Sequence, residues 1–133
     1  IAMLKTAGNI DTHIILRGGK TPNYDKDSIE NTLIALREAE VNESIMIDAS
    51  HGNSQKKFKQ QIPVVKSISD QIISGNSYIK GVMIESHLNE GNQKISDKLK
   101  YGQSITDACM GWDDTLSCLD QLNSAVEKRR SKK

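Results

Sequence analysis

Three runs of apolar residues, each followed by a polar or glycine-rich segment, predict β-strands at residues 12–19, 44–51 and 78–86. The centres of these runs are continuously apolar rather than alternating, as in Ile45, Met46 and Ile47. Continuous apolar strands are typical of a parallel sheet that is covered on both faces. The pattern therefore predicts three parallel strands.

Helical periodicity follows each predicted strand. In the first helical segment, Asp27 and Glu30 have the spacing of a capping box, and the apolar stripe behind them runs to Glu40. The stripe predicts a buried face made of Ile29, Leu33 and Leu36.

The second and third helical segments show the same period. The second follows Pro63 and ends at Gly75. The third begins near Asp113 or Asp114 and ends in the cationic run Lys128–Arg130, which suits the negative pole of the helix dipole. The residues predicted to face inward are Val64, Val65, Ile68 and Ile72 in the second helix and Leu116, Leu119, Leu122 and Val126 in the third.

The order of these elements indicates an α/β fold. Strand and helix alternate three times, and successive strands begin 32 and 34 residues apart, as βα units do in an α/β barrel. Right-handed crossovers would place the three strands side by side. A barrel needs eight units and about 250 residues, so 133 residues supply about three of them. An open three-layer sheet is the alternative, although no G-x-G-x-x-G phosphate turn follows the first strand.

Charge and cysteine content argue against several other classes of protein. A net charge of +1 gives no reason to expect nucleic acid or an anionic membrane as partner, and no apolar run reaches the ~18 residues of a membrane span. Cys109 and Cys118 form neither a metal-type spacing nor a disulfide framework, which suits a reducing cytosol. Neither is predicted to be a nucleophile, because Cys118 falls in the last apolar stripe and Cys109 has no paired histidine. The chain does not begin with Met, so we expect a fragment or processed product.

Charged and reactive side chains follow the predicted strands directly. Ligands bind at the carboxyl ends of parallel strands, because the loops that follow the strands converge there. The residues that this rule places on one rim are Arg17, Lys20, Asp48, His51, Glu85, His87, Glu90 and Asp107.

Three of these residues come from three successive loops and could converge on one point: His51, Glu85 and Asp107. An imidazole nitrogen with two carboxylates suits a divalent metal such as Mn, Fe, Co or Zn. The alternative is that His51 is a capped loop residue and the carboxylates cap helices. His13 and His87 are interpreted as structural.

Arg17 precedes Gly18 and Gly19 at the end of the first strand. Its guanidinium offers a bidentate fork for a phosphate or carboxylate, and the paired glycines would let a ligand approach the backbone. A structural salt bridge is the alternative explanation for the arginine.

Longer strings around these positions resemble one known family. They read GNIDTHIILRGGKTPNY, MIDASHGNS, GVMIESHLNEGNQ and YGQSITDACMGWDDT, in order between about Gly8 and Arg130. In these strings the chain resembles the type I 3-deoxy-D-arabino-heptulosonate 7-phosphate (DAHP) synthases. The resemblance implies a (β/α)8 barrel, in which residues 1–133 would form one partial domain containing strands six to eight and their helices.

The resemblance also implies an activity and a metal. The family condenses phosphoenolpyruvate with erythrose 4-phosphate and releases phosphate, the first step of the shikimate route to aromatic amino acids, and a cytoplasmic location is expected. Its metal is held by a cysteine, a histidine, a glutamate and an aspartate, of which the last three carry over to His51, Glu85 and Asp107. The cysteine has no counterpart here, and neither Cys109 nor Cys118 matches it.

Further roles follow from the same resemblance. Arg17 of "LRGG" would bind the phosphate of phosphoenolpyruvate, and Asp107 would also orient a hydroxyl of erythrose 4-phosphate. The metal would act as a Lewis acid on the aldehyde oxygen. Residues 1–8 are expected to be the tail of a hairpin that takes part in feedback inhibition by an aromatic amino acid, whose identity the chain does not reveal. A homo-oligomer is expected.

A function from another class stays open: a non-catalytic α/β domain that binds a divalent metal or a phosphate ligand. If the chain is the last part of a barrel, it should be inactive by itself, since a metal ligand and much of both substrate sites would be missing. An unpaired strand edge and an exposed sheet face would then favour self-association or instability.

Overall fold

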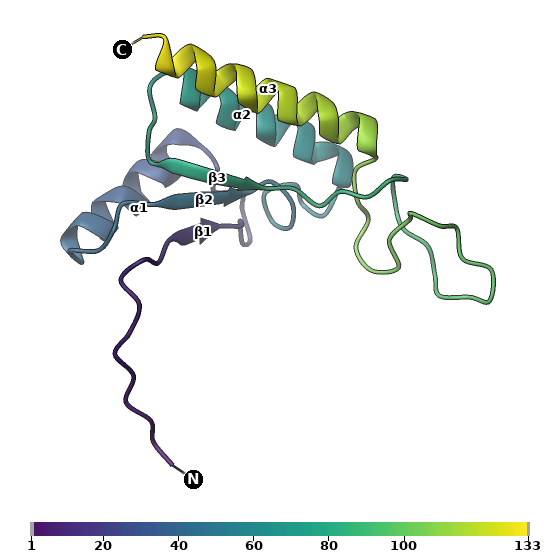
Figure 1. The fold of residues 1–133 in the computed structure, drawn as a ribbon, viewed down its shortest axis with the longest axis horizontal. Helices are drawn as coiled ribbons and strands as arrows, with labels where there is room; N and C mark the ends of the chain where they lie inside the picture. Colours follow the sequence, from purple (N-terminus) through teal and green to yellow (C-terminus); the bar gives the residue numbers. More distant parts are fainter. Residues whose placement is uncertain (1, 133) are drawn as a thin grey trace.

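The computed structural model of this protein describes residues 2–132, so Ile1, part of the predicted hairpin tail, lies outside the described residues. Residues 2–13 form no helix or strand and extend away from the body of the chain (Figure 1). No helix within residues 2–132 has both the length and the apolar character needed to cross a bilayer.

The sheet is parallel, as predicted, with the strand order β1-β2-β3. Its strands are β1 (Ile14–Leu16), β2 (Ile45–Asp48) and β3 (Ile79–Met83). Each strand is shorter than the predicted run, because the chain leaves the sheet at the rim. After β2, for example, the Asp48 side chain accepts the Ser50 backbone N–H at 2.8 Å and closes a turn.

Helix α1 (Lys26–Glu38) follows β1 and buries Ile29, Leu33 and Leu36 as predicted. Its predicted cap is wrong. Asp25, not Asp27, is the N-cap: its carboxylate accepts the Ser28 N–H at 2.9 Å and the Ser28 hydroxyl at 2.6 Å. Because Ser28 offers both its N–H and its hydroxyl to Asp25, the helix begins directly after Asp25. Asp27 then lies in the first turn, where an acidic residue complements the helix dipole.

Helix α2 (Gln61–Ile73) begins two residues before Pro63, directly after the 3₁₀-helix η1 (Phe58–Gln60). Pro63 thus lies in the first turn, where its missing N–H leaves no intrahelical hydrogen bond unmade. The helix ends before Gly75, which has the left-handed φ of 108° expected at this place. The predicted inward residues are all buried: Val64, Val65, Ile68 and Ile72.

Helix α3 (Trp112–Arg130) lies beside α2 on the same side of the sheet (Figure 1). Its predicted inward face is partly wrong. Leu122 and Val126 pack against the core, but Leu116 and Leu119 are 43% and 47% exposed. The buried residues of α3 are Thr115, Cys118 and Ala125. Periodicity identified the apolar stripe of α3, but only part of that stripe is covered in the structure, and Leu116 and Leu119 lie outside the covered part.

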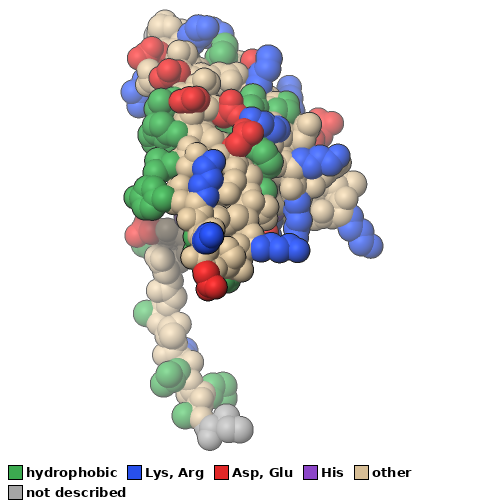
Figure 2. All heavy atoms as spheres, turned by 90° about the vertical axis from the view of Figure 1, so that its right-hand side faces the viewer, with side chains coloured by type: hydrophobic (Ala, Val, Ile, Leu, Met, Phe, Trp, Pro, Cys, Tyr) green, Lys and Arg blue, Asp and Glu red, His purple; other side chains and the backbone are tan. Residues whose placement is uncertain are grey.

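One hydrophobic core joins the three helices to one face of the sheet. Consecutive right-handed crossovers in an unreversed strand order place α1 and α2 on the same face, as in a barrel wall rather than a doubly wound sheet. The other face is more open, since Ile15 is 43% and Met83 is 37% exposed. Figure 2, which looks onto the right-hand side of Figure 1, shows hydrophobic side chains gathered along one side of the molecule.

Candidate metal centre

His51 reaches the rim through a tight turn after β2. The residue adopts a left-handed backbone conformation with φ of 44°, which is uncommon for a residue with a side chain. Its ring nitrogen Nδ1 lies 2.7 Å from Asp48 Oδ2 and 2.8 Å from Ser50 Oγ. The turn therefore brings the imidazole back over the end of its own strand and leaves Nε2 directed away from it.

Glu85 follows β3, and its backbone is held by Gln61, the first residue of α2. The Gln61 amide oxygen accepts the Glu85 N–H at 2.8 Å, and the Gln61 amide nitrogen donates to the Glu85 carbonyl at 3.1 Å. Gln61 is fully buried. Two hydrogen bonds from a buried side chain thus hold the Glu85 backbone in place.

The prediction that Asp107 lies in a separate loop from Glu85 is wrong, because both belong to the one long loop between β3 and α3, which folds back beside Glu85. The Met110 N–H donates to the Glu85 carbonyl at 3.0 Å, and the His87 N–H donates to the Met110 carbonyl at 3.0 Å. This pairing returns the loop to the strand end and brings the exposed Asp107 carboxylate to the rim.

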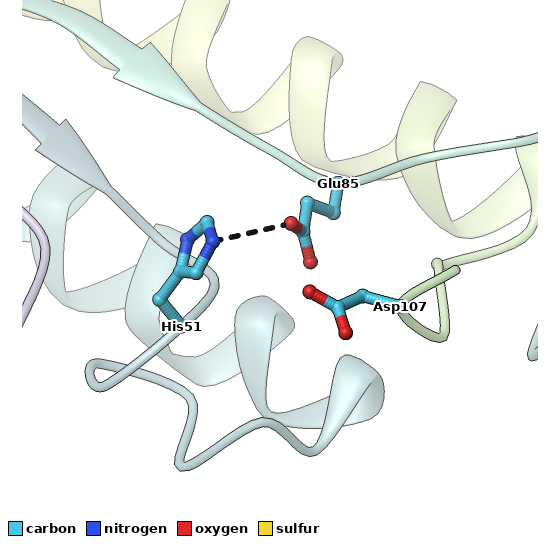
Figure 3. Close-up of side chains that lie close together, drawn as sticks. All are labelled: His51, Glu85 and Asp107. Carbon is cyan, nitrogen blue, oxygen red and sulfur yellow. Dashed lines mark ion pairs between the residues drawn. The ribbon is translucent and has the colours of Figure 1, made fainter.

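The three side chains converge, as the sequence predicted. His51, Glu85 and Asp107 each offer a ligand atom, and these atoms all lie within 4.8 Å of one another. His51 Nε2 is 3.5 Å from Glu85 Oε1, and Figure 3 shows the ring and both carboxylates directed toward one point from three separate segments. They line a small cavity of about 30 Å³, which is large enough to hold a water molecule.

The electrostatics of this cavity favour a cation. Burial raises the pKa of Glu85, and the nearby carboxylates of Asp107 and Asp48 raise it further, while His51 and Arg17 act in the opposite direction. Two carboxylates that face each other at the strand ends repel, and a divalent cation between them would relieve that repulsion.

Arg17 lines a second, adjoining cavity of about 480 Å³. Lys20 and Lys56 supply two more positive charges to its wall, and His51 borders both cavities. A ligand in the second cavity would therefore meet three cationic side chains while lying next to the imidazole. Lys56 was not predicted to line this cavity. It lies five positions after His51 in the loop, and the strand-end rule identifies only residues that directly follow a strand.

Two of the glycines near Arg17 also have a packing role that was not predicted. A Cβ on Gly18 would lie 2.5 Å from the Asn53 backbone nitrogen, and one on Gly52 would lie 2.7 Å from the Gly18 carbonyl carbon. These two glycines allow the loops after β1 and β2 to touch, and the Gly52 N–H donates to the Arg17 carbonyl at 3.0 Å. Gly19, in contrast, has open space in front of it, which fits the predicted approach of a ligand.

Several other rim residues lie outside the converging group. Glu90 forms an ion pair with Lys59. His13 is exposed and directly precedes β1, while the exposed His87 accepts the Leu88 N–H on its own Nδ1 at 2.8 Å. The Cys109 sulfur lies 3.5 Å from the Asp107 carbonyl, and burial raises the pKa of its thiol, the opposite of an activated nucleophile.

A cavity of about 660 Å³, larger than the two at the rim, lies between α1 and α2 and away from the strand ends. Its wall holds lysines and carboxylates, including the Lys66–Asp70 pair, but neither histidine nor cysteine. Its size alone therefore does not make it the reactive site. The chemistry of the donors places the candidate site at the strand ends.

The fold and the site together define a class: a parallel α/β segment with a histidine and two carboxylates at the carboxyl ends of its strands, beside a cation-lined cavity. The sequence comparison gives the family. Residues 1–120 match the DAHP synthetase I family, and the chain belongs to it.

Individual relatives agree with this assignment. The chain is 52% identical over 136 residues to a "Putative phospho-2-dehydro-3-deoxyheptonate aldolase" of Schizosaccharomyces pombe, in a match that covers 98% of this chain and 37% of that protein. It is 50% identical over 131 residues to the Phe-sensitive aldolase of the same name from Escherichia coli K12, covering 97% of this chain and 37% of that protein. The chain thus spans a little over a third of the length of these relatives.

A solved structure shows the same fold. The phospho-2-dehydro-3-deoxyheptonate aldolase of Francisella tularensis SCHU S4 superposes with a TM-score of 0.91 at 44% identity, over 96% of this chain and 38% of that one. The superposition therefore includes the strand-end loops as well as the strands and helices.

Proposed function

We propose that this chain is the part of a DAHP synthase that supplies βα units six to eight of a (β/α)8 barrel, with residues 1–133 forming one partial domain. The observation that carries the proposal is the convergence of His51, Glu85 and Asp107 beside the Arg17 cavity. Relatives of this chain are named as phospho-2-dehydro-3-deoxyheptonate aldolases. The complete protein would condense phosphoenolpyruvate with erythrose 4-phosphate and release phosphate.

Arg17 would bind the phosphate of phosphoenolpyruvate. Its planar guanidinium can donate two parallel hydrogen bonds to phosphate oxygens, and it lines a cavity together with Lys20 and Lys56. The pairing of the Arg17 carbonyl with Gly52 fixes the backbone from which the guanidinium extends. Holding the phosphate there would keep the enol carbon near the metal centre in attack geometry.

His51, Glu85 and Asp107 would hold a divalent metal. The donor set suits Mn, Fe, Co or Zn, and the three ligand atoms lie close enough together to reach one ion. A metal at this place supplies Lewis-acid polarisation of an aldehyde oxygen. A fourth ligand, a cysteine, would come from a part of the barrel outside this chain, and Asp107, the most exposed of the three, would also orient a hydroxyl of erythrose 4-phosphate.

Feedback inhibition by an aromatic amino acid is part of the proposal. The relatives include proteins named Phe-sensitive, Trp-sensitive and tyrosine-inhibited, and this chain is 50%, 47% and 52% identical to them. Such similar identities do not distinguish the three effectors. Residues 1–8 would be the tail of the hairpin involved in this regulation.

The open face of the sheet favours incompleteness over a self-contained binding domain. Ile15 on β1 and Met83 on β3 are exposed, and in a closed barrel such side chains would meet the remaining strands. The 133-residue chain by itself should therefore be inactive and prone to self-association. The complete protein would assemble as a homo-oligomer.

The deciding experiment measures phosphate release from the two substrates together with bound metal. In the complete protein, His51→Ala should lose metal and activity together, whereas His87→Ala, an exposed histidine on the same rim, should keep both. Normal metal content in the His51 variant would remove His51 from the ligand set. Phosphate release by the 133-residue chain alone would refute the claim that it is incomplete.

A second experiment tests the role of Arg17. Arg17→Ala should raise the KM for phosphoenolpyruvate and leave the metal content unchanged, since the guanidinium is not a ligand. Arg37→Ala is the matched control, because Arg37 lies on the surface of α1 and pairs with Glu43, which follows that helix. An unchanged KM for phosphoenolpyruvate in the Arg17 variant would contradict the assignment.

A further inference from the structure

The imidazole of His51 meets two oxygen atoms on its Nδ1 side. Asp48 Oδ2 lies 2.7 Å and Ser50 Oγ lies 2.8 Å from Nδ1. The only hydroxyl hydrogen of Ser50 is used elsewhere, because Ser50 Oγ donates to Asp48 Oδ1 at 2.5 Å. Ser50 therefore faces the ring with a lone pair, and both neighbours of Nδ1 act as acceptors.

This arrangement is buried and rigid. Asp48 is 2% and Ser50 is 1% exposed, and the Ser50 N–H also donates to Asp48 Oδ1 at 2.8 Å. Each carboxylate oxygen of Asp48 thus has its own donors, and neither is free to turn toward another group. Away from water, these hydrogen bonds are stronger than on the surface and costly to leave unmade.

We infer that Asp48 is a positioning residue that fixes His51 as the Nδ1–H tautomer and so leaves the lone pair on Nε2, the nitrogen that faces Glu85. Two acceptors at Nδ1 require a proton on that nitrogen. A neutral imidazole has only one N–H, so Nε2 must carry the lone pair. The inference rests on the proposed function in one respect: it is the lone pair on Nε2 that a metal between His51, Glu85 and Asp107 would need.

His87 provides the opposite case in the same chain. Its Nδ1 accepts the Leu88 N–H at 2.8 Å, so this ring must carry its proton on Nε2. The structure therefore assigns opposite tautomers to two histidines on one rim, and the difference follows from whether Nδ1 meets acceptors or a donor.

The tautomers can be read directly from the metal-free protein. The complete protein is labelled with ¹⁵N-histidine and stripped of metal with a chelator, and long-range ¹H–¹⁵N correlation spectra are recorded at a pH where the rings are neutral. The signals are assigned with His51→Gln and His87→Gln. The expected result is Nδ1–H for His51 and Nε2–H for His87. Nε2–H at His51, or two rings of the same tautomer, would overturn the inference.

Asp48→Asn should invert the His51 tautomer. The two Ser50 donors would hold the oxygen of the introduced amide where Oδ1 now lies, which directs the amide NH₂ at the ring and makes Nδ1 an acceptor. The affinity for Co²⁺ or Zn²⁺, measured by competition with a chromophoric chelator, should then fall ~10- to 100-fold. Ser50→Ala keeps the Asp48 contact and should keep the Nδ1–H tautomer. Asp70→Asn, which removes an exposed carboxylate on α2, is the control for loss of charge.

The outcomes separate this inference from the proposed function. Asp48→Asn with an unchanged Nδ1–H tautomer would overturn the role of Asp48. A wild-type protein that binds metal with His51 as Nε2–H would overturn the tautomer assignment and leave the proposed function standing. Conversely, Nδ1–H at His51 in a complete protein that binds no divalent metal would contradict the proposed function and support the tautomer assignment.

Discussion

The strand β2 and the turn after it contribute to two regions that are equally buried but held by different forces. Ile45 and Ile47 are 0% exposed in the core, and Asp48 and Ser50 are 2% and 1% exposed at the rim. The core residues contact the helices through dispersion and the hydrophobic effect, which have no preferred direction. The rim residues are held by hydrogen bonds, which join particular atoms in particular directions.

Because of this difference, neighbouring residues of one short segment contribute to different properties, the core residues to stability and the rim residues to function. A hydrophobic core tolerates changes of shape that conserve volume, so its residues specify the sheet but not the chemistry. A buried hydrogen-bonded turn tolerates almost no change, because a lost partner leaves a desolvated polar group. The core should therefore govern the free energy of unfolding and the rim the affinity for metal. Substitutions at four positions can break or sharpen this division.

The largest effect on stability is expected in the core. Ile47→Ala should lower the free energy of unfolding of the complete protein by about 2–5 kcal/mol, and Ile47→Val by about 0.5–1.5 kcal/mol, because a cavity replaces the missing atoms. Denaturant titration measures the loss. The metal affinity of the folded Ile47→Val protein should be unchanged, and a tenfold weakening there would show that the core and the rim are not separable.

Gln61 lies where the two regions meet, because it is buried like the core and hydrogen-bonded like the rim. Gln61→Met keeps the volume of the side chain but removes both hydrogen bonds to the Glu85 backbone. We expect a loss of about 1–3 kcal/mol from the unpaired Glu85 N–H together with weaker metal binding, while the Glu85 carbonyl keeps its hydrogen bond from the Met110 N–H. Chelator competition is the check on metal binding, with Gln71→Met as the control on the same helix. Unchanged metal affinity would show that Glu85 needs no such support.

A smaller effect is expected at Asp25, because its hydrogen bonds with Ser28 are directional like those at the rim but are exposed to solvent. Asp25→Ala should cost about 1 kcal/mol as a lost N-cap. Hydrogen bonds from the Ser28 hydroxyl and N–H lower the pKa of Asp25 below its usual 3.8. Its contribution is therefore present above that value and is lost as the pH falls through the lowered pKa. Wild type and variant should thus converge in stability in strong acid, and a constant difference at all pH values would contradict this.

Glu85→Gln should change stability least and in the opposite direction. Burial raises the pKa of Glu85 above its usual 4.5, so the ionised side chain disfavours the folded metal-free protein at neutral pH. The variant should be slightly more stable than wild type near pH 7, and this advantage should vanish below the usual pKa, where both states are protonated. Thermal unfolding in the presence of a chelator measures the gain. A loss of stability at pH 7 would show that Glu85 supports the fold.

The sequence predicted most of the core but not its edges. The buried apolar residues of α1 and α2 were all identified, because both helices pack directly on the sheet and their apolar stripes face a partner within the chain. In α3, the prediction for Leu116 and Leu119 was wrong, because a stripe shows which residues are apolar but not how far a neighbouring helix covers them. The cap of α1 was misplaced because Asp25 and Asp27 both precede an apolar stripe, and only the contact with Ser28 distinguishes them.

The sequence by itself determined the alternation of strand and helix, the parallel sheet, and the presence of His51 and Glu85 directly after two neighbouring strands, with Asp107 further along the chain. These features depend on residue spacing along the chain, and spacing is what a sequence records. Only the tertiary structure decided that the three ligand atoms lie within 4.8 Å of one another, that Gln61 fixes Glu85, and that Asp48 faces the His51 ring. The physical reason is that hydrogen bonds act over about 3 Å, a distance that only the folded backbone sets, both within the turn from Asp48 to His51 and between residues far apart in the chain.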